Sequence, residues 1–252
     1  MELKKAVSEK RCVIIALDQG MEHGPSDFND WSMDPRNIVN ALSQHADGFM
    51  LNRGIAEIAK PKCSLILKLT GKTALCERLM QAPIASVEDA KKLKASAVAA
   101  TVYIGSPEEQ NMMAFSGRII SEAKRAGLYS MGLMYPRGPL VKNKHAPEIV
   151  AYAARAGAEL GFDCIKTHYT GSRDSFARVV EACPKPVLMA GGGKTSDAAF
   201  LTTVKNVMEA GAAGVVVGRN VWQHKAPLKM LEAVTEIVKH DSSAGIALRC
   251  LK

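Results

Sequence analysis

A lysine that ends a short apolar run is the strongest candidate for a chemically reactive residue in this sequence. Lys166 follows Cys164 and Ile165 in a stretch that is typical of a buried strand. A lysine in such a place loses part of its hydration, which lowers its pKa and frees the amine to attack a carbonyl carbon. The alternative is a lysine whose ammonium group extends from the strand end into water. Lys166 is therefore a candidate Schiff-base nucleophile.

Two side chains capable of acid–base chemistry also end apolar runs, namely Asp18 and Tyr135. Each has a structural alternative, since Asp18 could be a turn aspartate beside glycine and Tyr135 a core tyrosine. If they lie beside Lys166, they can transfer protons to and from a reacting carbon or hydroxyl. We expect the nearby cation of Arg137 to favour the phenolate form of Tyr135.

Glycines and a basic side chain come together after the last two predicted strands. One loop contains Gly191 and Gly192, and the other contains Gly218 and Arg219. Glycine lets the backbone approach an anion, helix amino termini add partial positive charge, and arginine binds phosphate through its planar fork. The alternative is that these glycines serve only tight turns between strand and helix. The pattern favours a phosphate-binding site.

These residues require a fold that gathers the ends of several strands. Apolar, β-branched runs alternate with amphipathic segments along the chain, which is typical of βα units around a parallel sheet. We expect strands at residues 13–18, 48–51, 64–69, 97–103, 129–135, 164–166, 186–190 and 214–217. We expect helices at residues 86–94, 107–126, 146–160, 174–182, 197–210 and 227–240.

Eight strand–helix units in 252 residues, with no linker-like segment, predict a single α/β domain over residues 1–252. The predicted fold is a (β/α)8 TIM barrel, in which the active site forms at the carboxyl ends of the strands. A doubly wound nucleotide-binding sheet is disfavoured because the chain has no Gly-x-Gly-x-x-Gly fingerprint.

Composition excludes several classes of protein. The formal net charge is +8, but basic residues are mixed with acids on predicted helices and lack interleaved aromatic residues, which argues against a nucleic-acid partner. No apolar run is long enough for a signal peptide or a membrane span, so we expect a cytoplasmic protein with no membrane partner. The six cysteines show no paired spacing and are expected to be reduced packing residues, with no metal site.

Five motifs, in the same order as in the family, resemble those of the archaeal-type class I fructose-bisphosphate aldolases. They occupy residues 18–25, 67–73, 135–138, 165–171 and 217–223. The resemblance implies that Lys166 forms the Schiff base, that Tyr135 transfers protons and that Asp18 is the acidic residue of the first strand. It also implies a phosphate site made of Gly191, Gly192, Gly218 and Arg219.

The activity implied by this resemblance is the reversible cleavage of fructose 1,6-bisphosphate to dihydroxyacetone phosphate and glyceraldehyde 3-phosphate, a reaction of glycolysis and gluconeogenesis. The expected partner is a phosphorylated sugar, and no cofactor or metal is expected. The resemblance further suggests a ring-like homo-oligomer, either a pentamer or a decamer.

Three positions depart from the family pattern. Gln19 stands where the first motif commonly has histidine, Leu133 where several members have tryptophan, and Ala190 where serine is frequent. They leave open the related 2-amino-3,7-dideoxy-D-threo-hept-6-ulosonate synthases, which share the lysine chemistry. The related autoinducer thiolases often lack the Tyr-Pro-Arg motif found here at residues 135–137. A sugar-phosphate-binding protein without catalysis is the alternative from another class.

Overall fold

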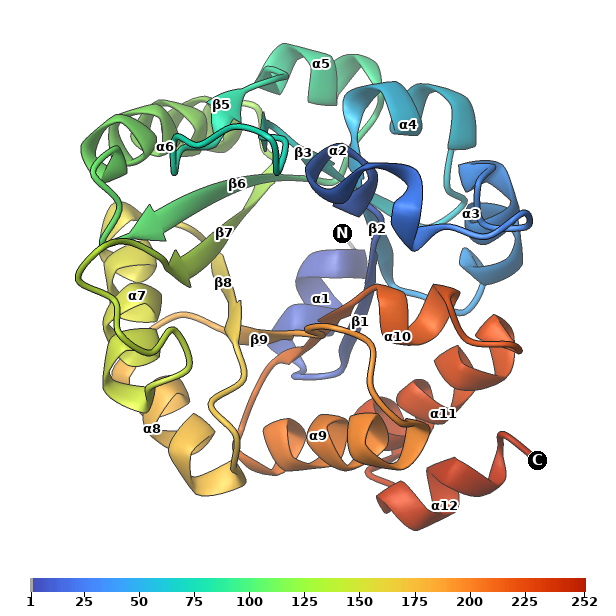
Figure 1. Cartoon of the computed structure of the whole chain (residues 1–252). Coiled ribbons are helices and arrows are strands. Elements are labelled where there is room, and N and C mark those ends of the chain that lie inside the picture. Colours follow the sequence, from blue (N-terminus) through green and yellow to red (C-terminus); the bar gives the residue numbers. More distant parts are fainter. Residues whose placement is uncertain (1) are drawn as a thin grey trace.

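Eight parallel strands close into a barrel in the computed structural model, which describes residues 2–252 (Figure 1). The strands are β1 (Cys12–Ala16), β2 (Gly48–Asn52), β3 (Ser64–Lys68), β6 (Ala97–Ile104), β7 (Tyr129–Pro136), β8 (Cys164–His168), β9 (Val187–Ala190) and β10 (Gly214–Val217). Each pairs with its neighbours in this series, and β10 pairs with β1 to close the sheet. The predicted TIM barrel and its eight strands are thus confirmed.

Helices surround the barrel, and the six predicted ones are all present (Figure 1). These are α5 (Val87–Lys92), α6 (Glu109–Arg125), α7 (Pro147–Leu160), α8 (Arg173–Ala182), α9 (Asp197–Glu209) and α11 (Pro227–His240). The sequence prediction missed α1 (Glu2–Ser8), α2 (Gln19–His23), α3 (Pro35–Leu42), α4 (Arg53–Ala59), α10 (Arg219–Trp222) and α12 (Ala244–Arg249). Most of these are short, and short helices carry little periodic signal.

Local chemistry explains where several of the predicted helices begin and end. The Ser86 hydroxyl accepts a hydrogen bond from the amide of Asp89, whose carboxylate accepts one from the amide of Ser86, a reciprocal cap that starts α5. Gly127, Gly161 and Gly211 follow α6, α7 and α9 with φ of 71°, 103° and 89°. Glycine adopts this left-handed conformation at little cost, so it ends each helix as predicted.

Strand alternation divides the apolar residues into two groups. One side of each strand packs against the helices, whereas the other fills the barrel with residues such as Ile14, Met131 and Leu188. Leu3 and Val7 of α1 belong to this inner group and close the amino-terminal end of the barrel. The floor of the barrel is therefore apolar, and polar chemistry is confined to the opposite end, which we call the mouth.

Two connections at the mouth contain structure that the sequence did not reveal. The chain after β1 forms α2 and a short 3-10 helix, Gly24–Asp27. The chain after β3 forms a small antiparallel pair, β4 (Thr70–Gly71) with β5 (Ala82–Pro83). Both connections supply polar residues to the mouth, as described below.

Three of the cysteines, Cys12, Cys164 and Cys183, are buried packing residues, as expected, whereas Cys76 is exposed. No group of histidine, cysteine, aspartate and glutamate within residues 2–252 is arranged to hold a metal ion. None of the helices in this range has both the length and the apolar character of a membrane span.

Candidate active site

Lys166 points into the barrel because it shares the inner face of β8. Cys164 belongs to the inner apolar group, while Ile165 packs outward against the helices, so the next inward positions are Lys166 and His168. Only 6% of Lys166 is exposed. The amine therefore lies at the base of the mouth, directly above the apolar filling of the barrel.

A single cavity of about 130 Å³ at the mouth is lined by every residue that the sequence nominated. These residues are Asp18, Tyr135, Lys166, Gly191, Gly192, Gly218 and Arg219. They come from the ends of β1, β7, β8, β9 and β10 or from the residues that follow. The barrel thus brings together side chains that lie up to about 200 positions apart in the chain.

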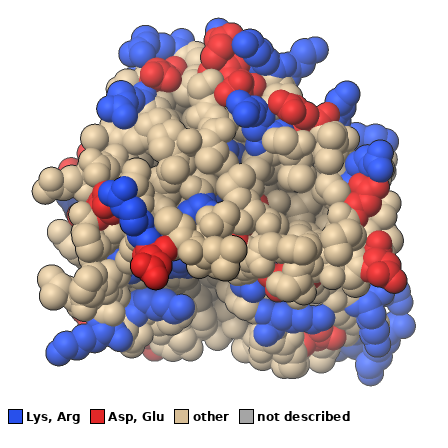
Figure 2. All heavy atoms as spheres, turned by 45° about the horizontal axis from the view of Figure 1, so that its top comes forward, with Lys and Arg blue, Asp and Glu red and all other residues tan. Residues whose placement is uncertain are grey.

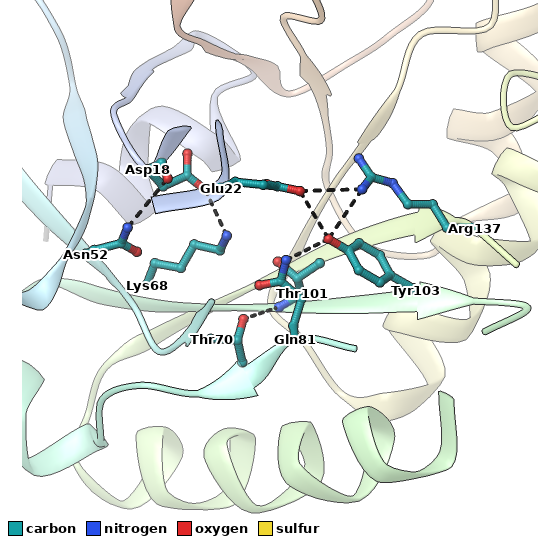
Figure 3. Close-up of polar contacts among 9 residues, drawn as sticks. All are labelled: Asp18, Glu22, Asn52, Lys68, Thr70, Gln81, Thr101, Tyr103 and Arg137. Atoms are coloured by element: carbon teal, nitrogen blue, oxygen red, sulfur yellow. Dashed lines mark hydrogen bonds and ion pairs between the residues drawn. The ribbon is translucent and has the colours of Figure 1, made fainter. Parts of the chain in front are cut away.

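A buried ion pair lines the same cavity as Lys166, and Figure 3 shows its two side chains, Asp18 and Lys68. Nζ of Lys68, the last residue of β3, donates to Oδ2 of Asp18 at 2.8 Å, and both side chains are almost fully buried. The sequence analysis did not nominate Lys68. The signal was nevertheless present, because Lys68 lies near the end of an apolar run, as Lys166 does.

Charge and burial together set the protonation of Lys166. Burial is the main cause that lowers its pKa, and the ammonium group of Lys68 lowers it further, against the opposing carboxylates of Asp18 and Glu22. The resulting pKa is about 8, well below the ordinary value for lysine. Burial alone would raise the pKa of Asp18, but Lys68 and Lys166 reverse the effect and lower it, so Asp18 is ionised at neutral pH.

Tyr135 is a neutral phenol, contrary to the expectation that Arg137 would favour its phenolate. Burial raises the pKa of Tyr135 well above its usual value, and the Asp18 carboxylate raises it further. The Arg137 guanidinium, 5.8 Å from the centre of the Tyr135 ring, opposes this shift but is outweighed. Tyr135 can therefore donate its proton and recover it, but it does not hold a permanent negative charge.

A polar network that the sequence analysis missed forms one wall of the cavity (Figure 3). The Tyr103 hydroxyl accepts hydrogen bonds from Nε2 of Gln81 at 2.6 Å and from Arg137 at 3.4 Å, and donates to Glu22 at 3.4 Å. The Arg137 guanidinium also lies over the Tyr103 ring, 4.7 Å from its centre. Gln81 and Glu22 stand in connections with no strand periodicity, and although Glu22 belongs to the motif at residues 18–25, no local pattern indicated that either side chain meets Tyr103.

The glycine cradle, formed by Gly191, Gly192, Gly218 and Arg219, lies across the cavity at the ends of β9 and β10. A Cβ at Gly218 would lie 2.6 Å from Nε2 of Gln19, and one at Gly191 would lie 3.0 Å from the Cα of Val217. At Gly218 a Cβ would also lie 2.9 Å from the backbone carbonyl oxygen of Ala16, so close packing favours glycine there, whereas at Gly191 a Cβ would make a tight contact. The amide of Gly191 already donates to a strand carbonyl, so Gly191 contributes space and not a free donor.

The guanidinium of Arg219 makes only long hydrogen bonds within the protein. Nη2 donates to the carbonyl of Gly192 and Nη1 to Oδ2 of Asp27, both at the long distance of 3.4 Å, and the buried Nε has no partner. Lys194, the other basic residue of these loops, donates instead to the carbonyl of Gln223 at 2.9 Å. Of these two basic residues, only Arg219 lines the cavity.

The three departures from the family pattern all line this cavity, since Gln19, Leu133 and Ala190 are part of its wall. Oε1 of Gln19 is buried without a hydrogen-bond partner. Figure 2 shows acidic and basic side chains mixed around the molecular face in view. The three residues that depart from the family pattern are therefore concentrated where a substrate would bind.

Comparisons with known proteins show which family and which solved structures this chain is similar to. The model of the DeoC/LacD family aldolases matches residues 12–224. A class 1 fructose-bisphosphate aldolase of Thermoproteus tenax is 46% identical over 90% of this chain and 89% of its own length, and one from Halobacterium salinarum is 38% identical over 94% of each. The solved structure of an archaeal fructose-1,6-bisphosphate aldolase, with its catalytic lysine bound to the carbinolamine intermediate, superimposes with a TM-score of 0.90 at 42% identity, covering 94% of this chain and 99% of that one.

Proposed function

Because the chain belongs to the DeoC/LacD family of aldolases, and within it to the archaeal-type class I fructose-bisphosphate aldolases, we propose that Lys166 is the Schiff-base lysine of this activity. The enzyme cleaves fructose 1,6-bisphosphate reversibly to dihydroxyacetone phosphate and glyceraldehyde 3-phosphate. The observation that carries the assignment is the position of Lys166, buried with a pKa of about 8 between Asp18, Tyr135 and the glycine cradle.

The first stage joins the sugar to the enzyme. The neutral amine of Lys166 attacks the C2 carbonyl and forms a carbinolamine, which loses water to become an iminium ion. Tyr135, as a neutral phenol close to the site, donates the proton that the departing hydroxyl requires and later recovers it. Asp18 remains ionised and stabilises the positive charge of the iminium ion.

The second stage breaks the carbon–carbon bond. The Tyr135 phenolate left by the first stage takes the proton of the C4 hydroxyl, and the C3–C4 bond breaks. Its electron pair moves into the iminium ion, which gives an enamine and free glyceraldehyde 3-phosphate. The enamine then takes the proton back from Tyr135 at C3, which regenerates an iminium ion. Water hydrolyses this iminium ion and returns a proton to Tyr135, which releases dihydroxyacetone phosphate and restores Lys166. The iminium ion is the electron sink, so the scheme needs no metal for this task.

Borohydride trapping combined with a cleavage assay tests the proposed function. After incubation with dihydroxyacetone phosphate and reduction, a mass increase is expected on the peptide that contains Lys166. Cleavage of fructose 1,6-bisphosphate is measured beside the aminosugar condensation of the related synthases. Tight binding with no reducible adduct would instead indicate a sugar-phosphate-binding protein.

Arg219→Ala should weaken the binding of phosphorylated substrates far more than the binding of unphosphorylated ones. The variant loses a charge-assisted contact to phosphate, which contributes on the order of 1.5 to 3 kcal/mol, so the preference for dihydroxyacetone phosphate over dihydroxyacetone should fall roughly tenfold to a hundredfold. The matched control is Lys194→Ala, because the Lys194 ammonium group is bonded to the Gln223 carbonyl. Equal losses for both substrates in Arg219→Ala would place Arg219 in a structural ion pair with Asp27.

The low pKa of Lys166 predicts how cleavage depends on pH. Only the neutral amine attacks the ketone, and with a pKa of about 8 its neutral fraction is about one tenth at pH 7 and about nine tenths at pH 9. kcat/KM should therefore rise with pH through about 8. Lys68→Met removes a nearby positive charge, which raises the pKa of Lys166 and moves this rise to higher pH, whereas Lys68→Arg should not. An unchanged profile in Lys68→Met would mean that Lys68 does not tune the nucleophile.

We also propose that residues 1–252 form one catalytic domain, that the enzyme acts in the cytoplasm, and that it assembles as a ring-like homo-oligomer. The location is supported by the substrate, because a doubly phosphorylated sugar does not cross a bilayer unaided. Assembly is supported by the exposed apolar side chains of Met21 and Met33, which line an apolar groove beside α2. Sedimentation velocity measures the size of the assembly.

A further inference from the structure

The last residue of β8, His168, has no role in the scheme above although it lines the same cavity. It lies two positions beyond Lys166 on the inner face of the strand. Its ring stacks on Tyr135 with a centroid separation of 4.5 Å and an interplanar angle of 27°. The ring of His145, from the connection before α7, approaches it at 5.0 Å with a tilt of 49°.

One nitrogen of His168 lacks the partner that its burial requires. Nε2 is shielded from solvent and makes no hydrogen bond. The other histidine of the stack differs, because Nδ1 of His145 lies 3.0 Å from the carbonyl oxygen of Tyr169. A buried polar atom without a partner is destabilising by about 1–3 kcal/mol and is uncommon in folded proteins. Since the ring borders the cavity, a bound molecule is the natural source of the missing partner.

The protonation of His168 indicates which chemical group fits. Burial lowers the pKa of His168 to about 3, helped by His145, Arg137, Lys144 and Lys166. The ring is therefore neutral at physiological pH, with one nitrogen that donates and one that accepts. A sugar hydroxyl both donates and accepts and so matches either tautomer, whereas a phosphate would prefer a cation such as Arg219.

The position of His168 indicates which hydroxyl is in reach. It pairs with Ala190 of β9, immediately before the glycine cradle, so its ring lies between Tyr135 and the proposed phosphate site. The ketone half of the substrate spans the distance from that site to Lys166. The hydroxyl of this half lies on C3, next to the carbon that is joined to the lysine.

We propose that His168 is a substrate-binding residue whose ring nitrogen hydrogen-bonds the C3 hydroxyl of the ketone half. The inference rests on the function proposed above, since it needs the Schiff base on Lys166 to place C3. The contact would help to select ketones that carry this hydroxyl. It would also hold the bond to be broken beside Tyr135, which stacks on the same ring.

Two ketone phosphates that differ only in this hydroxyl test the proposal. Dihydroxyacetone phosphate has it and hydroxyacetone phosphate lacks it, and both can form a Schiff base. The adduct trapped by borohydride on Lys166 is measured against concentration for each. We expect wild-type enzyme to prefer dihydroxyacetone phosphate roughly tenfold, the value of one hydrogen bond in a buried site. His168→Phe, which keeps a stacked ring but no nitrogen, should reduce this preference to less than about twofold.

The control is His145→Phe, which alters the other histidine of the stack and should keep the preference. Undiminished preference in folded His168→Phe overturns the role of His168 while leaving the Schiff-base function intact. Failure of the wild-type enzyme to trap either ketone would instead overturn the proposed function.

A second measurement does not depend on the stability of a variant. In wild-type enzyme labelled with nitrogen-15 in its histidine rings, the reduced dihydroxyacetone phosphate adduct should shift the His168 ring resonances relative to the hydroxyacetone phosphate adduct. Identical His168 resonances in the two adducts contradict the proposal.

Discussion

Lys166→Met is expected to reduce cleavage of fructose 1,6-bisphosphate by more than about a thousandfold, which corresponds to roughly 4 kcal/mol of transition-state stabilisation. Methionine has a similar length and is apolar, so it fits the site, where Lys166 is 6% exposed and stands above the apolar filling of the barrel. The fold should persist because the Asp18–Lys68 ion pair remains. A coupled assay of the triose phosphates measures the loss, and thermal melting checks the fold.

The matched control is Lys91→Met, which removes an exposed lysine from α5 and should leave kcat/KM unchanged. Turnover by folded Lys166→Met within about tenfold of the wild type, a loss of about 1.4 kcal/mol, would refute the Schiff-base assignment. In Lys166→Met, borohydride should trap no adduct at any other lysine, Lys68 included, if Lys166 is the nucleophile.

Tyr135→Phe should lower kcat about a hundredfold while the trapped adduct is partly retained. The change removes only the hydroxyl, and a positioned proton-transfer group commonly contributes a factor of this size. Because the pKa of Tyr135 is raised well above its usual value, the hydroxyl carries its proton throughout the neutral range. The ratio of wild-type to variant kcat should therefore stay constant from pH 7 to 9, which separates this loss from the titration of Lys166.

Tyr152→Phe is the control for this change, because Tyr152 is exposed on the outer helix α7. Single-turnover measurements distinguish the cleavage step from formation of the adduct. If kcat is unchanged in Tyr135→Phe and only the melting temperature falls, Tyr135 is a packing residue that supports His168 through the ring stack.

The sequence by itself determined the architecture, and it nominated residues that the structure brings together in one cavity. Each strand was readable because an apolar, β-branched run is a local property, and glycines such as Gly161 mark helix ends through their own backbone freedom. Eight such units leave few ways to pack other than a closed barrel, which places Lys166 at the mouth. The strand period of two also fixes which side chains face inward once one inward residue is known.

Only the tertiary structure decided how the site residues meet and in which ionisation state. The Asp18–Lys68 pair and the contacts of Tyr103 with Glu22 join segments far apart in the chain, so they depend on the stagger of neighbouring strands and on loops without periodicity. The expected phenolate of Tyr135 failed for a related reason. A pKa sums desolvation with every nearby charge, and here burial outweighs Arg137. These quantities belong to the folded arrangement in space, because no local pattern in the chain encodes a distance between side chains from different strands.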